Sequence, residues 1–188
     1  MRIAFLLLFL AAPAFAQNTP SKTPEVPQAV APGCGAPVVT FAVKTHDEQH
    51  PFPQPAAGKA LIYFIQDDSQ YEAPSEPTTR FGVDGHWVGA THGSSYFYFS
   101  VEPGEHHLCA SWQGKKEAYF EAAAPLKTEA GQRYFFRVGN TFISVKGRPF
   151  ADPLNIPPMR TMRLKQVNAD EGQLLASEYA FATSHREP

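Results

Sequence analysis

The sequence lacks any concentration of positive charge and any second long apolar run. Its net charge is −2, and its longest run of Lys or Arg is the pair Lys115-Lys116. Nucleic acids and anionic lipids are therefore not expected partners, because both depend on clustered cations. Beyond the N-terminus, charged residues, Gly or Pro interrupt each apolar run within about eight residues, well short of the roughly 20 needed to span a bilayer as a helix.

Recognised catalytic and nucleotide-binding motifs are also missing. No serine lies in a Gly-x-Ser-x-Gly elbow, and His and Asp occur without a spacing that indicates a catalytic triad. We therefore expect a protein that is not an enzyme and that needs no cofactor.

The N-terminus carries the strongest local signal in the chain. Arg2 precedes an apolar run from Ile3 to Ala12, which the small-residue pattern Ala14-Phe15-Ala16 follows. This order is typical of a secretory signal peptide, here residues 1–16, cut after Ala16. We expect a periplasmic or secreted protein without a transmembrane anchor, and Gln17 at the cleavage point offers no thiol for lipid attachment.

The chain has only two cysteines, Cys34 and Cys109. In an oxidising compartment an isolated pair forms a disulfide more often than it stays reduced. Closing a loop of about 75 residues would stabilise the fold by roughly 4 kcal/mol in the loop-entropy description. The alternative is two separately buried thiols, since free Cys packs as a small apolar side chain.

The 15 Phe, 7 Tyr and 18 Pro favour strands and interrupted loops over long helices. Alternating or short apolar runs predict strands near residues 38–44, 60–65, 81–83, 86–89, 96–101, 105–112, 118–120, 134–138, 142–145 and 162–167. Asp84-Gly85 predicts a tight hairpin turn, and Gly139-Asn140 a second turn. The spacing of about ten residues predicts a mainly β fold, a sandwich or barrel of antiparallel strands.

The domain boundaries follow from composition. Residues 17–37 are rich in Pro and polar residues and predict an extended tether. Residues 38–180 form the single β-sandwich domain, which includes a short C-terminal helix from Gly172 to Tyr179, capped near Asn168 or Asp170. Residues 181–188 are expected to be a flexible tail.

Four groups of short motifs carry a resemblance to a known family. They are residues 58–63 (GKALIY), 83–89 (VDGHWVG), 95–97 with 103–108 (SYF and PGEHHL), and 130–135 (AGQRYF). The chain resembles the bacterial domain-of-unknown-function 2846 family, and this resemblance implies an immunoglobulin-like or transthyretin-like β-sandwich in an exported or lipid-anchored envelope protein. No enzymatic role is established for the family, so it supplies no functional residue.

Four aromatic residues are candidates for a binding surface: Trp87, Tyr96, Tyr98 and Phe135. On outward faces they could bind a glycan, a peptide or another envelope protein, because Tyr and Trp offer a large contact area with a polar tip. Alternatively, a second layer such as the tether or the C-terminal helix covers them. The preferred interpretation is a non-catalytic envelope module that binds a protein or glycan through a sheet face or through the Pro-rich loops 67–79 and 147–158.

A periplasmic metal-binding protein is the alternative function. Six of the seven histidines lie between residues 46 and 107, and His46, His50 and His107, with Cys109 as a further ligand, could hold zinc or copper. His106 and His107 are adjacent on a strand, so they face opposite ways and cannot easily share one ion. His106 is expected to be a partly buried residue of the sandwich, and a disulfide at Cys109 would remove the thiolate ligand.

Overall fold

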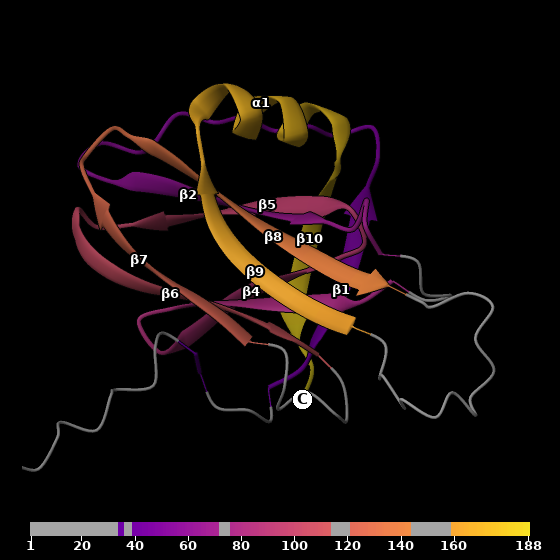
Figure 1. Ribbon diagram of the computed structural model, residues 1–188. Helices are drawn as coiled ribbons and strands as arrows, with labels where there is room; N and C mark the ends of the chain where they lie inside the picture. The colour runs from indigo at the N-terminus through magenta and orange to yellow at the C-terminus, as the bar shows by residue number, and fades with distance from the viewer. Residues whose placement is uncertain (1–33, 36–38, 72–75, 114–120, 144–158) are drawn as a thin grey trace, which may run out of the picture.

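The structure is a computed structural model that describes residues 34–35, 39–71, 76–113, 121–143 and 159–188. Within these residues the chain forms two β-sheets that pack against each other, with one helix over the outer face of the larger sheet (Figure 1). The predicted signal peptide, residues 1–16, most of the predicted tether, the predicted strand at 118–120 and the loop 147–158 lie outside the described residues.

The larger sheet contains six strands and the smaller sheet four. The larger sheet has, in spatial order, β1 (Phe41–His46), β10 (Ala180–Arg186), β5 (Ser95–Val101), β2 (Ala60–Asp67), β8 (Arg133–Ile143) and β9 (Met159–Val167). The smaller sheet has β4 (His86–His92), β3 (Thr78–Val83), β6 (Gly104–Trp112) and β7 (Glu121–Thr128). Neighbours are antiparallel except for two parallel pairs, β2 with β8 and β10 with β5. The prediction of a mainly β sandwich is thus confirmed.

The main core fills the space between the two sheets. Ile62, Phe64 and Phe97 of the larger sheet pack into one cluster with Phe81 and Leu108 of the smaller sheet. The ring centroids of Phe64 and Phe81 lie 4.8 Å apart. Each strand contributes alternate residues to this cluster, as the period of two requires.

Strand β2 is buried on both of its faces. Its other face, with Leu61, Tyr63 and Ile65, belongs to a second cluster that includes Ala176 of the helix α1 (Ala169–Glu178). The continuous apolar run at residues 60–65 predicts this double coverage, which is confirmed.

The hairpin predicted at Asp84-Gly85 joins β3 and β4. Asp84 has φ 50° and Gly85 has φ 79°, so both central residues adopt the positive φ of a tight primed turn. The predicted helix cap is also present, because the Asn168 side chain accepts a hydrogen bond from the Glu171 backbone N–H at 2.9 Å.

Two sequence expectations are wrong. Gly139-Asn140 does not turn the chain, because β8 continues from Arg133 to Ile143 and pairs with β9 from Phe135 to Ile143. Residues 181–188 are not a flexible tail, since β10 lies between β1 and β5 and its backbone pairs with both. The reason is that each segment finds its hydrogen-bonding partners in strands that are distant in sequence.

Candidate functional site

The four candidate aromatic residues do not form an outward-facing patch. Tyr96, Phe135 and Trp87 are buried, with exposed fractions of 0%, 2% and 4%, and Tyr98 is half-buried. Tyr96, Tyr98 and Phe135 lie in the cluster beneath α1, so the C-terminal helix covers this face of the sheet. The alternative prediction, that a second layer covers the rings, therefore describes Tyr96, Tyr98 and Phe135.

Trp87 lies apart from the other three rings, near the end of the predicted tether. A Cβ at Gly35 would be only 2.6 Å from Trp87 Cδ1, so the Gly35 backbone packs directly on the indole. The Arg80 guanidinium lies over the same ring, 4.7 Å from its centroid. Trp87 therefore contributes to attaching the N-terminal segment to the domain.

The predicted disulfide between Cys34 and Cys109 is present in the structure. The Cα atoms of the two residues are 5.2 Å apart, and Cys109 is 1% exposed on β6. The bond fixes the segment that packs on Trp87 to the smaller sheet.

The histidines of the metal hypothesis are not brought together. His46 Nε2 lies 3.1 Å from Thr183 Oγ1 in β10, and His50 Nδ1 lies 3.3 Å from the Ala176 carbonyl oxygen of α1, whereas His107 is on β6 in the other sheet. Cys109 is occupied by the disulfide. Across the described part of the chain, no three His, Cys, Asp or Glu side chains are grouped so that they could hold a metal ion.

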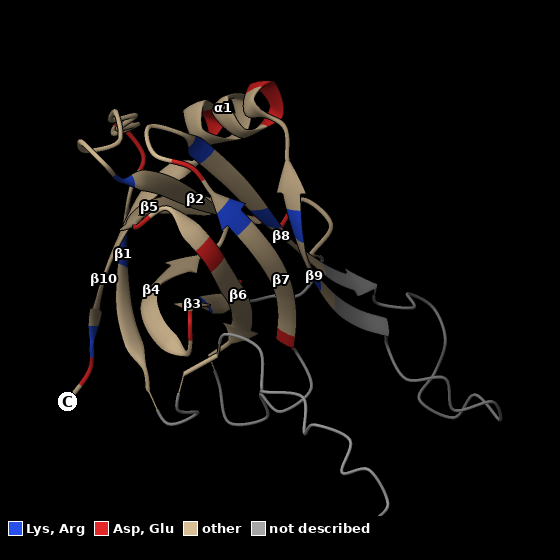
Figure 2. Cartoon of the chain, turned by 90° about the vertical axis from the view of Figure 1, so that its left-hand side faces the viewer, with Lys and Arg blue, Asp and Glu red and all other residues tan. Residues whose placement is uncertain are grey.

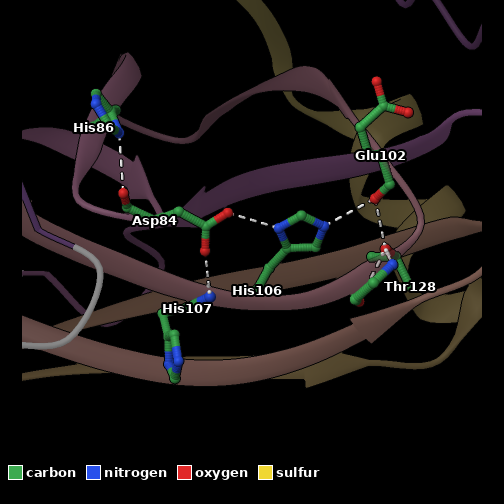
Figure 3. Close-up of polar contacts among 7 residues, drawn as sticks. Asp84, His86, Glu102, His106, His107 and Thr128 are labelled. Atoms are coloured by element: carbon green, nitrogen blue, oxygen red, sulfur yellow. Dashed lines mark hydrogen bonds and ion pairs between the residues drawn. The ribbon is translucent and has the colours of Figure 1, made fainter.

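Among the residues that the structure describes, His106 and Asp84 form a close pair of a histidine and a carboxylate (Figure 3). His106 Nδ1 is 2.7 Å from Asp84 Oδ2, and His106 Nε2 is 2.8 Å from the Glu102 carbonyl oxygen. His106 is on β6, Asp84 is in the β3–β4 turn, and Glu102 is in the turn between β5 and β6. The imidazole side chain is only 11% exposed, so it joins two turns at one end of the molecule from a largely enclosed position.

Further hydrogen bonds hold both acceptors in place. Asp84 Oδ1 accepts from the His107 backbone N–H at 2.8 Å, and the Asp84 carbonyl oxygen accepts from His86 Nδ1 at 2.9 Å. The Glu102 carbonyl oxygen also accepts from Thr128 Oγ1 of β7, at 2.9 Å. The side chains of His86 and His107 point away from the imidazole of His106 (Figure 3).

The pair shifts the pKa values of both its members. Burial by itself lowers the pKa of His106, but the hydrogen bonds to Asp84 and to the Glu102 carbonyl, with the Asp84 charge, outweigh it and raise that pKa above the ordinary histidine value. Burial raises the pKa of Asp84, yet the hydrogen bonds from His106 and His107 bring it below the ordinary value. Both shifts favour the charged forms.

This arrangement does not suit general base catalysis. A catalytic imidazole needs one nitrogen free to accept a proton from a nucleophile, but here one nitrogen faces a carboxylate and the other a carbonyl oxygen. The nearby Thr128 hydroxyl donates to the same carbonyl oxygen rather than to the ring. The strand pattern of the sequence predicts a partly buried His106, but no local pattern indicates its pairing with Asp84, which depends on the packing of two turns.

A second feature is a depression between α1 and the segment before β2. His50, Phe52, Gln173, Leu174, Ala176 and Ser177 line this depression, which has a volume of about 380 Å³. Leu174 is 56% exposed and is the one exposed large hydrophobic side chain of the residues described. Phe52 is one of the lining residues, and its ring stacks on Phe135 with centroids 6.0 Å apart.

The helix beside this depression is acidic. Asp170, Glu171 and Glu178 lie on α1, and residues 168–179 contain no Lys or Arg (Figure 2). Two arginines contact this region: Arg137 pairs with Glu171 at 3.0 Å, and Arg133 donates to the Pro53 carbonyl oxygen at 3.0 Å while lying over the Phe52 ring. The depression therefore has a partly apolar lining and lies beside a helix whose own charged residues are all acidic.

In the ranges that the structure covers, no helix is long and apolar enough to cross a membrane.

Comparison with known proteins gives one match, to a family model. No curated protein and no solved structure gives a significant match to the chain. Residues 56–147 match the model of a family described as protein of unknown function (DUF2846). This segment contains β2 to β8 and the four groups of sequence motifs. It also contains His106 and the residues that bind it, Asp84 and Glu102. By this match, residues 56–147 belong to the DUF2846 family.

Proposed function

We propose that the protein is an exported, non-catalytic envelope module that binds another protein at the depression between α1 and residues 50–52. The observation that carries this proposal is the exposure of Leu174 beside the hollow formed with Phe52. An apolar side chain beside a hollow can pack against an anchor side chain of a partner protein.

The charge around the depression favours a partner segment with an apolar residue flanked by Lys or Arg. Asp170 and Glu178 on α1 would attract such a segment, as would Asp47 and Glu48, which are exposed just before His50. Charge complementarity of this kind selects the partner and speeds association.

A glycan is the less favoured ligand. Sugar binding commonly uses the exposed face of an aromatic ring, but Trp87, Tyr96 and Phe135 are buried. The Phe52 ring in the depression already contacts Phe135 and the Arg133 guanidinium.

Two observations support the export and the lack of catalysis. The leader-like residues 1–16 and a disulfide both fit an oxidising compartment. The His106 ring has both nitrogens engaged with oxygen acceptors, which leaves no lone pair to activate a nucleophile.

The test uses defined peptides and NMR spectroscopy of the labelled protein. Peptides with one Leu or Phe between Lys or Arg residues are compared with peptides in which Glu replaces each cation. We expect the basic peptides alone to shift the amide signals of His50, Phe52 and residues 173–177. Leu174→Ser should weaken binding by about tenfold, since it removes a buried apolar contact of roughly 1.5 kcal/mol or more.

The matched control is Gln166→Ser, because Gln166 is exposed on β9 and does not line the depression. Equal binding of the acidic and basic peptides would refute the charge argument. Shifts caused by soluble peptidoglycan fragments, with none caused by any peptide, would identify a glycan-binding module instead.

A further inference from the structure

His106 connects three parts of the chain at one end of the smaller sheet. The imidazole reaches Asp84 in the β3–β4 turn and the Glu102 carbonyl in the β5–β6 turn. Through that carbonyl it shares an acceptor with Thr128 at the end of β7, and Thr128 Oγ1 in turn accepts from the Gly104 N–H at 3.1 Å. The β3–β4 turn, the β5–β6 turn and the end of β7 thus meet at the His106 side chain (Figure 3).

The number of protons on the ring decides whether both contacts hold. A carboxylate and a carbonyl oxygen can only accept, so each ring nitrogen must donate. A neutral imidazole has a single N–H and would leave one nitrogen lone pair facing an oxygen lone pair. Only the imidazolium satisfies the distances of 2.7 Å and 2.8 Å together.

The groups around the ring favour its positive charge. The Asp84 carboxylate faces it from the β3–β4 turn, while the Glu102 carboxylate is paired with Lys59 and only its backbone carbonyl reaches the ring. From β7, Leu126 lies opposite His106 in the register and brings no charge. The His107 backbone N–H and the His86 ring nitrogen bind Asp84. Both of these imidazoles point away from the His106 ring (Figure 3).

We propose that His106 is a pH-sensitive clamp, which in its protonated form ties the β3–β4 turn to the β5–β6 turn and which opens that end of the smaller sheet when it loses its proton. The clamp is independent of the depression at α1 and of the function proposed for it. It would make the local stability of this end of the smaller sheet fall as the pH rises.

The direction of the response follows from the two pKa shifts. The pKa of His106 is raised in the folded chain, chiefly because its bonds to Asp84 and Glu102 outweigh burial, so its stabilisation is complete below the unfolded histidine pKa and is lost as pH rises through the folded value. The pKa of Asp84 is lowered, so its contribution is lost as pH falls through that lower value. The clamp is closed between these limits.

The test is an NMR titration of the oxidised, isotope-labelled protein. The Nδ1 and Nε2 chemical shifts distinguish an imidazolium from either neutral tautomer. We expect His106 to titrate at a higher pH than the same residue in the urea-unfolded chain. Over that transition, the amide protons of His107 and Gly104 should lose protection from hydrogen exchange by about tenfold, as expected for loss of a charge-assisted hydrogen bond.

An internal reference and a variant pair complete the test. The amide of Leu61, bonded to the Gln132 carbonyl in the larger sheet, should keep its protection factor over the same pH range. Asp84→Asn should lower the His106 midpoint, since Asn tolerates the positive φ at this position but carries no charge. Asp47→Asn, the same change at an exposed loop position, should leave that midpoint where it is.

The wild-type titration alone can overturn the proposal. A neutral His106 ring below the midpoint of the unfolded chain, a midpoint at or below the unfolded value, or unchanged protection of the His107 and Gly104 amides would each do so. This result does not depend on whether Asp84→Asn folds.

Discussion

At the scale of single residues, a buried polar network explains why Asn140 continues a strand rather than turning the chain. Asn140 is fully buried, donates to Asp68 Oδ1 at 2.8 Å and accepts from Trp112 Nε1 at 2.8 Å. Asp68 also accepts from Gln66 Nε2 at 2.6 Å, and Gln66 Oε1 accepts from Thr91 at 2.6 Å. The network joins β2, β8, β4 and β6, so it connects the two sheets.

The change Asn140→Ala should therefore destabilise the protein. It leaves Trp112 Nε1 and Asp68 Oδ1 each without this buried partner, and an unsatisfied buried polar group costs about 1–3 kcal/mol. We expect a fall of that size in the free energy of unfolding, measured by urea denaturation at pH 7. Gln166→Ala, which removes an exposed amide from β9, should change it by less than about 0.5 kcal/mol. Equal effects of the two variants would show that the network contributes nothing specific.

At the scale of elements, the close approach of α1 to the larger sheet depends on one glycine. Gly172 is buried in the first half of the helix, and a Cβ there would lie 2.2 Å from Phe135 Cγ. Phe135 is 2% exposed and stacks on Tyr63 with centroids 4.9 Å apart, so its ring has little room to move. The absence of a side chain at residue 172 is what lets the helix cover this sheet face.

The change Gly172→Ala accordingly has two opposite effects on stability. Alanine is the better helix former by about 1 kcal/mol, but overpacking a filled core costs about 1–3 kcal/mol. Because the contact is with a buried ring, we expect a net loss of stability in thermal or urea unfolding. Gln173→Ala, on the exposed side of the same helix, gains propensity without the clash and should be neutral or stabilising. A stabilising Gly172→Ala would mean that the helix shifts outward at little cost.

At the scale of the whole molecule, the N-terminal segment and the C-terminal strand close the same side of the sandwich. Phe41 of β1 packs with Trp87 and Cys109 of the smaller sheet, and Arg186 at the end of β10 donates to the Trp87 carbonyl oxygen at 2.8 Å. The disulfide fixes this side covalently, with its two cysteines 75 positions apart in the sequence.

Removing both cysteines, as Cys34→Ser with Cys109→Ser, should lower the free energy of unfolding by about 2–4 kcal/mol, because the unfolded chain regains the entropy of an open loop. Urea denaturation followed by tryptophan fluorescence measures this loss. The emission of the folded variant should also move to longer wavelength, since Gly35 would no longer be held against the Trp87 indole. A variant as stable as the oxidised protein would contradict a stabilising role for the bond.

Local sequence alone determined the elements that need only near neighbours. The alternating apolar residues of β5 and β6, the Asp84-Gly85 turn, and the Asn168 cap each follow from backbone sterics and side-chain periodicity within a few residues. The disulfide was also predictable, because only two cysteines exist to pair.

Tertiary structure decided everything that required a distant partner. The polar residues of β10 look like a tail until β1 and β5 supply hydrogen bonds, and Tyr96 and Phe135 could face solvent until α1 covers them. His106 gains its charge-assisted contact only because two separate turns meet around it. Burial and pairing across long sequence separations depend on how the sheets pack, and no local pattern encodes that packing.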